Sequence, residues 1–240
     1  MQINKDANGY TFLFSISIVI IVGVVLSSLT LALGPRKKYN VEVKKKMDIL
    51  SAIGVESTRA DGVEKYDLYI KDAYVISVDG VLQEDLPTDK QAFNLDVLKQ
   101  SRDKTIAEKD KLFPIFEAEI DGEVQYVLPV VGKGLWGPVW GYVAIASDYE
   151  TITGVSFDHS GETPGLGAEI SQPFFEDQYI DEKIGGNGES LDILVVKDGT
   201  GAGINQKVDG ITGGTITSKG VERMVNENMK VYYNYFSKIK

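Results

Sequence analysis

The sequence predicts an α+β protein, in which a single N-terminal transmembrane helix precedes an α/β domain with a mostly antiparallel sheet. Three observations predict this class. Residues 11–33 form an uncharged apolar run. Two segments of strand-like pattern flank Asp121-Gly122, a dipeptide typical of a tight β-hairpin turn. After Ser218, apolar residues recur at helical spacing to the end of the sequence.

The apolar run Thr11–Leu33 is long enough for a membrane span. As a helix it would extend roughly 34 Å, which exceeds the hydrocarbon core of a bilayer. Ala32-Leu33-Gly34 faintly resembles a signal-peptide cleavage site. A signal-peptide core is shorter than this run, however, so we expect a retained anchor. Arg36, Lys37 and Lys38 follow at once, and the positive-inside tendency would place the rest of the chain in the cytoplasm.

Periodicity then assigns the elements in order. A helical face precedes Gly54, and a polar, helical connector leads up to Lys111. Strands are predicted at Tyr66–Ile70, Ala73–Val78, Phe113–Ile120, Val124–Val130, Trp140–Ala146, Thr151–Phe157 and, buried, at Leu191–Val196. Pro173 begins a short helix. We expect three regions: an anchor over residues 1–36, a membrane-proximal α/β region over 37–110, and a ligand-binding domain over 111–240.

Composition excludes several classes of function. The net charge is −10 with a pI near 4.7, which argues against nucleic acid as a partner. The sequence has no cysteine and one histidine, His159, so thiolate metal sites and multi-histidine sites are excluded. We therefore predict no metal site on this chain.

The segment Asp209–Ser218 holds the densest set of candidate site residues. Its glycines supply the positive φ angles of a tight loop, and Thr217 or Ser218 is expected to cap the helix that follows. Hydroxyls at Thr212, Thr215 and Thr217 would then lie at the positive end of a helix, where backbone N–H groups suit an anion such as phosphate. An ordinary capped loop is the alternative interpretation.

Two further loops carry candidate ligand contacts. Gly132–Gly137 is a glycine-rich turn that presents Leu135 and Trp136. Glu162–Gly167 is a Pro-Gly loop bounded by the carboxylate of Glu162 and the apolar side chain of Leu166. Taken singly, Trp136 could be a core residue and the second loop a plain surface turn.

Asp209–Thr217 resembles the flavinylation motif of bacterial membrane redox complexes, in which a hydroxyl receives FMN through its phosphate. Gly214 stands where that motif usually has alanine. With the other two loops, in this order behind one anchor, the whole chain resembles the family of the C subunit of the sodium-translocating NADH:quinone reductase. The G subunit of the Rnf electron-transport complex is a second, weaker resemblance.

The family resemblance implies a site and a cofactor. A flavin transferase would esterify FMN to Thr215 within an FMN-binding domain over residues 111–240. Thr163 and Leu166 would line the isoalloxazine, and Glu162 near the ring would lower the flavin potential. The cofactor-binding residues expected on this basis are Leu135, Trp136, Glu162, Thr163, Leu166, Gly213, Thr215 and Thr217.

The resemblance also implies a role and a location. The chain would relay electrons among the other subunits of a membrane NADH:quinone reductase, anchored in the bacterial inner membrane through residues 11–33. The family places its flavin domain in the periplasm, which we expect here despite the basic cluster. No Gly-x-Gly-x-x-Gly lies between a predicted strand and a predicted helix, so NADH oxidation would belong to a partner chain. A reversible ligand-binding module is the alternative of a different class, and a threonine or serine hydrolase is disfavoured by the single histidine.

Overall fold

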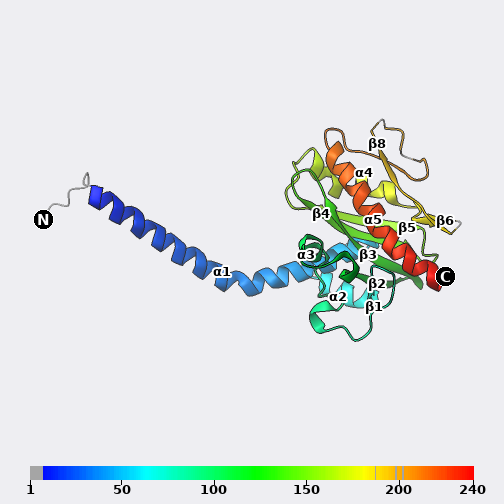
Figure 1. The fold of residues 1–240 in the computed structure, drawn as a ribbon, viewed down its shortest axis with the longest axis horizontal. Coiled ribbons are helices and arrows are strands. Elements are labelled where there is room, and N and C mark those ends of the chain that lie inside the picture. Colours follow the sequence, from blue (N-terminus) through cyan, green and yellow to red (C-terminus); the bar gives the residue numbers. More distant parts are fainter. Residues whose placement is uncertain (1–7, 187, 198, 202) are drawn as a thin grey trace. The chain divides into compact units, whose positions relative to one another are not determined.

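The structure is a computed structural model that describes residues 8–186, 188–197, 199–201 and 203–240, apart from the side chain of residue 89. It divides into two compact units, with the division between Lys45 and Lys46. The helix α1, Asn8–Ala52, runs through the division (Figure 1). The expected helix at residues 11–33 is confirmed and lies within α1, which by length and composition can cross a membrane.

A five-stranded antiparallel sheet forms the centre of the second unit, with the strand order β1-β2-β3-β4-β5. The strands are β1 (Ile70–Ser77), β2 (Leu112–Ile120), β3 (Glu123–Lys133), β4 (Pro138–Ala146) and β5 (Ile152–His159). The predicted hairpin is confirmed, because Ile120 pairs with Glu123 and both intervening residues have positive φ. Since β1 pairs with β2, residues on both sides of the expected boundary at 110/111 share one sheet.

The predicted strand at Tyr66–Ile70 is wrong. These residues belong mostly to the helix α2, Gly62–Tyr69, and β1 begins only at Ile70. The buried positions of α2 are Gly62 and Tyr66, which are four residues apart as one face of a helix requires. A short apolar run of this kind does not distinguish a strand from a helix by periodicity alone.

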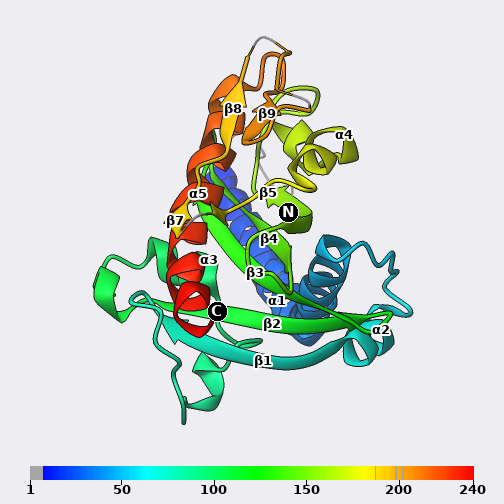
Figure 2. The same cartoon turned by 90° about the vertical axis from the view of Figure 1, so that its right-hand side faces the viewer.

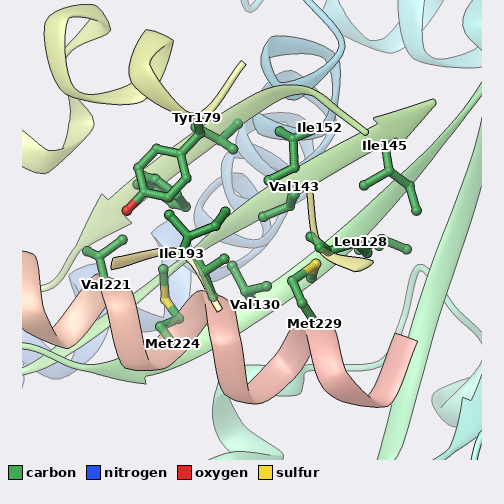
Figure 3. Close-up of a cluster of buried hydrophobic side chains, with 14 of the residues drawn as sticks. Leu128, Val130, Val143, Ile145, Ile152, Tyr179, Ile193, Val221, Met224 and Met229 are labelled. Carbon is green, nitrogen blue, oxygen red and sulfur yellow. The ribbon is translucent and has the colours of Figure 1, made fainter. Parts of the chain in front are cut away.

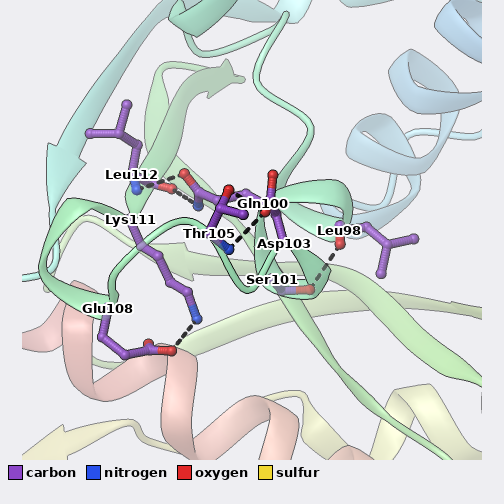
Figure 4. A network of polar contacts seen from close by, with 8 residues as sticks. All are labelled: Leu98, Gln100, Ser101, Asp103, Thr105, Glu108, Lys111 and Leu112. Atoms are coloured by element: carbon purple, nitrogen blue, oxygen red, sulfur yellow. Dashed lines mark hydrogen bonds and ion pairs between the residues drawn. The ribbon is translucent and has the colours of Figure 1, made fainter.

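The predicted helical connector is also largely wrong. Between β1 and β2 the chain forms only α3 (Val97–Arg102) and the single 3-10 turns η1 (Thr88–Lys90) and η2 (Glu108–Asp110). Polar side chains satisfy backbone groups here in place of a helix, as Figure 4 shows. The Gln100 amide donates to the Leu112 carbonyl at 2.9 Å and accepts from the Leu112 N–H at 3.0 Å, which ties the connector to the start of β2.

Helices cover both faces of the sheet (Figure 2). One face packs against α5 (Thr215–Ile239) and against the segment η3 (Gly167–Ser171), α4 (Pro173–Glu176) and η4 (Asp177–Tyr179). The opposite face packs against the end of α1 and against α2. Successive residues of a strand point to opposite faces, so Leu128 joins the first core and Val127 the second. Figure 3 shows the first core, with Met224 and Met229 of α5 facing Val130 and Leu128 of β3.

Short strands complete the domain beside α5. β6 (Gly185–Gly186) pairs with β7 (Glu189–Ser190), and β8 (Leu194–Val196) lies parallel to β9 (Lys207–Asp209). The buried strand expected at Leu191–Val196 is thus confirmed only from Leu194 onward. The expected short helix at Pro173 is confirmed as α4.

Candidate functional site: three loops around a buried carboxylate

Three loops meet at one end of α5, and each is positioned by an element of the core. The turn at residues 134–137 joins β3 to β4 and is closed by a hydrogen bond from the Gly134 N–H to the Gly137 carbonyl at 2.8 Å. The second loop, residues 160–166, joins β5 to η3. The third loop, residues 210–214, joins β9 to α5 and therefore ends where the helix begins.

The Glu162 carboxylate joins these loops. Its Oε1 accepts the Trp136 N–H at 2.9 Å, and its Oε2 accepts the Thr217 hydroxyl at 2.6 Å. The residue is only 4% exposed. A Cβ at Gly134 would lie 2.5 Å from Oε1, and one at Gly167 would lie 2.6 Å from Oε2. Glycine is therefore required at both positions, because the backbone closes directly around the carboxylate.

The helix α5 begins three residues earlier than Ser218, the position from which its periodic pattern was read. Its first helical residue is Thr215, its N-cap is Gly214, and no side chain caps it. The expectation that Thr217 or Ser218 caps the helix is wrong, because both lie inside its first turn. Ser218 instead closes the preceding loop by accepting the Ile211 N–H at 3.1 Å and donating to the Gly214 carbonyl at 3.0 Å.

The three threonine hydroxyls of the motif differ in availability. Thr217 is 1% exposed, and its hydroxyl is bound to Glu162. Thr212 is exposed on the loop before the helix. Thr215 is half-buried at the first position of α5, and its hydroxyl makes no hydrogen bond within the part of the chain that the structure describes. A free hydroxyl beside unpaired helix N–H groups can carry a phosphate there.

Leu166 lies over the loop that precedes Thr215. A Cβ at Gly213 would be 2.5 Å from Leu166 Cδ2, and Gly213 has φ +75°, so only glycine fits. The Thr163 carbonyl accepts the Leu166 N–H at 3.1 Å, which shapes the Pro-Gly loop between them. Leu166 is nevertheless 41% exposed, so its side chain also faces outward.

Large apolar side chains remain exposed on these loops. Trp136 is 70% exposed, and Leu135 beside it is also exposed. Trp136 is therefore not a core residue. The eight residues expected at the site all lie on the three loops or on the first turn of α5. An exposed apolar group of this kind suits an aromatic ring or a partner surface.

Sequence reasoning missed the residues that organise the site. Gly134 and Gly167 could be recognised only as turn glycines, although their role is to admit the Glu162 carboxylate. His159 was assigned no role, yet its Nδ1 accepts the Glu162 N–H at 3.2 Å. Asp209, the first residue of the motif, accepts the Gly201 N–H at 2.7 Å and so holds a neighbouring loop.

Within the described residues there is no cluster of three or more His, Asp or Glu side chains suited to a metal ion.

Comparisons with known proteins identify relatives of this chain. Residues 134–230, which include all three loops, match the family model of the FMN-binding domain. The C subunit of the Na(+)-translocating NADH-quinone reductase of Vibrio parahaemolyticus is 30% identical over 236 residues, which cover 92% of this chain and 90% of that protein. The protein of the same name from Haemophilus ducreyi is 30% identical over 230 residues, with coverages of 92% and 89%.

A solved structure gives the same result for the fold. The crystal structure of the C subunit from Parabacteroides distasonis superposes with a TM-score of 0.75 at 38% identity, and covers 85% of this chain and 96% of that one. The fold is thus that of an FMN-binding domain that follows an apolar helix. The chain belongs to the family of the C subunit of the Na(+)-translocating NADH-quinone reductase. The α+β fold class and the family resemblance are both confirmed.

Proposed function

We propose that this chain is the flavoprotein subunit of a sodium-translocating NADH:quinone reductase, and that it carries FMN covalently on Thr215 and relays electrons within the complex. The observation that carries the proposal is the unengaged Thr215 hydroxyl at the first position of the 25-residue helix α5. The relatives are C subunits of Na(+)-translocating NADH-quinone reductases, which supports the assignment to this complex. The matching family model is an FMN-binding domain, which supports FMN as the cofactor.

The attachment is a phosphoryl-group transfer to the threonine hydroxyl. With a flavin dinucleotide as donor, the Thr215 oxygen would form a bond to the flavin-bearing phosphorus and the phosphoanhydride bond from that phosphorus to the second nucleotide would break. The nucleoside monophosphate would leave with the electron pair of that bond, and the proton of the hydroxyl would be released. We expect a flavin transferase to catalyse this step. The resulting phosphodiester carries one negative charge, which the N-terminus of α5 would stabilise by about 0.3–1 kcal/mol.

The first turn of α5 favours Thr215 over the other hydroxyls of the motif. Thr217 lies two residues further on, but its hydroxyl is buried and donates to a carboxylate. Thr212 is exposed but lies three residues before the first helical position, outside the helix. Because Thr215 alone combines a free hydroxyl with the helix N-terminus, it is the acceptor we propose.

The exposed apolar side chains around this point fit a flavin ring. Leu166, Trp136 and Leu135 would shield parts of the isoalloxazine from water, and the exposed Thr163 beside them would face its polar edge. Bound FMN supplies reversible one- and two-electron transfer, which the protein orients and tunes. A covalent tether would keep the cofactor in place in a compartment open to the outside.

We further infer that the helix α1 spans the inner membrane once and that the flavin domain faces the periplasm. The apolar length of α1 supports the span, whereas Arg36, Lys37 and Lys38 oppose this orientation by the positive-inside tendency. Protease added to intact spheroplasts should digest the domain. Protection that persists until the membrane is opened would instead place the domain in the cytoplasm.

Mass and fluorescence of the purified full-length chain test the flavin attachment. Co-expression with a flavin transferase should give a chain heavier by FMN minus water, with a fluorescent band on a denaturing gel. Thr215→Ala should leave the band dark, whereas Thr212→Ala, the matched control three residues earlier in the motif, should stay bright. Flavin that is lost on denaturation would indicate a reversible binding module, and a bright Thr215→Ala band would refute Thr215 as the acceptor.

A further inference from the structure

We propose that Glu162 is a positioning residue for the acceptor threonine: through Thr217 it fixes the first turn of α5, and through the Trp136 N–H it holds the 134–137 turn beside it. This inference rests on the proposed attachment at Thr215. It gives Glu162 a role distinct from contact with the ring, because both carboxylate oxygens are engaged inside the protein.

The burial of Glu162 needs a reason of this kind. A buried carboxylate is costly unless it is paired or well hydrogen-bonded. In the part of the chain that the structure describes, Glu162 has no ion pair with a lysine, arginine or histidine side chain. Its two acceptor bonds go to two separate segments, the 134–137 turn and the first turn of α5, so the carboxylate joins them. Packing alone does not explain a carboxylate at this position, because a neutral side chain of the same volume would pack equally well.

The position of Thr217 explains how this bond reaches the acceptor. Thr217 is the third residue of α5, and Thr215 is the first. The start of α5 has no side-chain cap of its own. The bond from Thr217 to Glu162 is therefore a tertiary anchor for a turn that would otherwise fray, and its loss would let the Thr215 hydroxyl vary in direction.

The surrounding glycines make the anchor rigid. A Cβ at Gly167 would lie 2.5 Å from the Thr217 hydroxyl oxygen, and a Cβ at Gly220 would lie 2.5 Å from the Lys133 carbonyl. The η3 backbone thus closes over the anchor, and α5 lies directly on the end of β3. Small displacements of the carboxylate are therefore transmitted to both the helix and the 134–137 turn.

Attachment kinetics of the full-length chain in detergent test this proposal. The variants are Glu162→Gln, which removes the charge at nearly constant shape, Thr217→Val, which removes the hydroxyl, and Thr217→Ser, which retains it. Leu50→Ala is the matched control, because Leu50 lies in the core on the opposite face of the sheet. We expect attachment by the transferase to slow about tenfold or more in Glu162→Gln and Thr217→Val, since a hydrogen bond to a charged group is lost.

The controls separate positioning from stability. Thr217→Ser should attach flavin at nearly the wild-type rate, and Leu50→Ala should do so although it is destabilised. Hydrogen exchange at the Trp136 N–H should accelerate in Thr217→Val, because the freed carboxylate no longer joins α5 to the 134–137 turn. Equal slowing in Leu50→Ala and Glu162→Gln would overturn the proposal and leave the attachment at Thr215 intact. An unmodified wild-type chain would overturn the attachment itself, and the positioning role with it.

Discussion

The two faces of the five-stranded sheet are both covered by helices, but they differ in how the helices are held. The core against the end of α1 and α2 consists of apolar side chains such as Leu50 and Phe116. On the other face, α5 also bonds to the strands by side chains. Asn228 donates to the Val131 carbonyl at 3.0 Å, and Tyr232 donates to the carbonyls of Pro114 at 3.1 Å and Pro129 at 3.0 Å.

The polar residues explain this difference. The buried polar or charged residues among those described are Glu162, Thr217, Ser218 and Asn228, and all of them lie in α5 or bond to it. Apolar contacts are non-directional, so they fill a face without fixing the position of a helix along it. Hydrogen bonds are directional and fix such a position. The face that ends at the candidate flavin site is therefore the one on which hydrogen bonds fix the position of the helix along the strands.

Leu50→Ala should give the largest loss of stability with the smallest effect on flavin. Leu50 is fully buried, and truncation of such a leucine costs about 2–5 kcal/mol in the free energy of unfolding. Urea unfolding of the chain in detergent measures the loss, and the flavin content of the folded fraction should stay near one per chain. A proportional loss of flavin would show that the two faces are not independent.

Gly220→Ala should disturb the face covered by α5. Alanine favours a helix by about 1 kcal/mol over glycine, yet its Cβ would meet the Lys133 carbonyl, and overpacking costs about 1–3 kcal/mol. We expect a net loss of stability of about 1–2 kcal/mol together with slower flavin attachment, both measured as above. Gly161→Ala is the matched control, because no atom lies within 4 Å of its added Cβ. Unchanged stability of Gly220→Ala would contradict the close contact between α5 and β3.

Two tyrosine hydroxyls in the same core should behave in opposite ways. The Tyr232 hydroxyl bridges two strand carbonyls at the place where the pairing of β2 with β3 ends, so Tyr232→Phe should cost about 1–3 kcal/mol in unfolding free energy. The buried Tyr179 hydroxyl has no hydrogen-bond partner among the described residues, so Tyr179→Phe should be neutral or stabilising. A clear loss in Tyr179→Phe would indicate a bound water that serves this hydroxyl.

Glu176 should make the stability of this face depend on pH. Burial raises the pKa of the Glu176 carboxyl to about 7 from an ordinary 4.5, against the lowering effect of the Phe157 N–H that it accepts. Asp177, Asp48 and Asp158 raise the pKa further. The folded protein thus retains a proton that the unfolded chain has released, and stability falls as pH rises from 4.5 to about 7.

Glu176→Gln tests that dependence, because the amide oxygen can still accept the Phe157 N–H. The stability of the variant relative to the wild type should increase as the pH rises from about 5 to about 8. Unfolding free energies at the two pH values measure the gain. An equal difference between variant and wild type at both values would place the titration elsewhere.

Leu166→Ala should have the smallest effect on stability and a distinct effect on the flavin. Leu166 is substantially exposed, so its truncation removes little buried area. Loss of apolar cover would admit water to the ring and stabilise charged reduced forms, which raises the reduction potential. A redox titration should show this shift at unchanged flavin content. An unchanged potential, or loss of the flavin, would remove the 160–166 loop from the cofactor wall.

The sequence predicted the hairpin, the β4 and β5 strands and the loops of the site because each rests on local pattern. Asp121-Gly122 and the alternation around it need no distant partner. The strand predicted at Tyr66 was wrong because a short apolar run fits a strand and a helix equally well. The Glu162 bond to Thr217 spans 55 residues, and no local pattern reports such a contact. Local pattern and family resemblance thus indicated the candidate loops, whereas tertiary contacts decide what each residue in them does.

The covering of β2 and β3 by α5 has a consequence for biosynthesis. The strands are made first, and part of their apolar face stays open until residues 215–239 have left the ribosome. Any chain that stops before Thr215 would expose that face and be prone to aggregation or proteolysis. Thr215 and the helix that completes the fold emerge together, so a nascent chain cannot present the acceptor in its folded setting before translation has passed α5. Flavin loading would then report on completed folding.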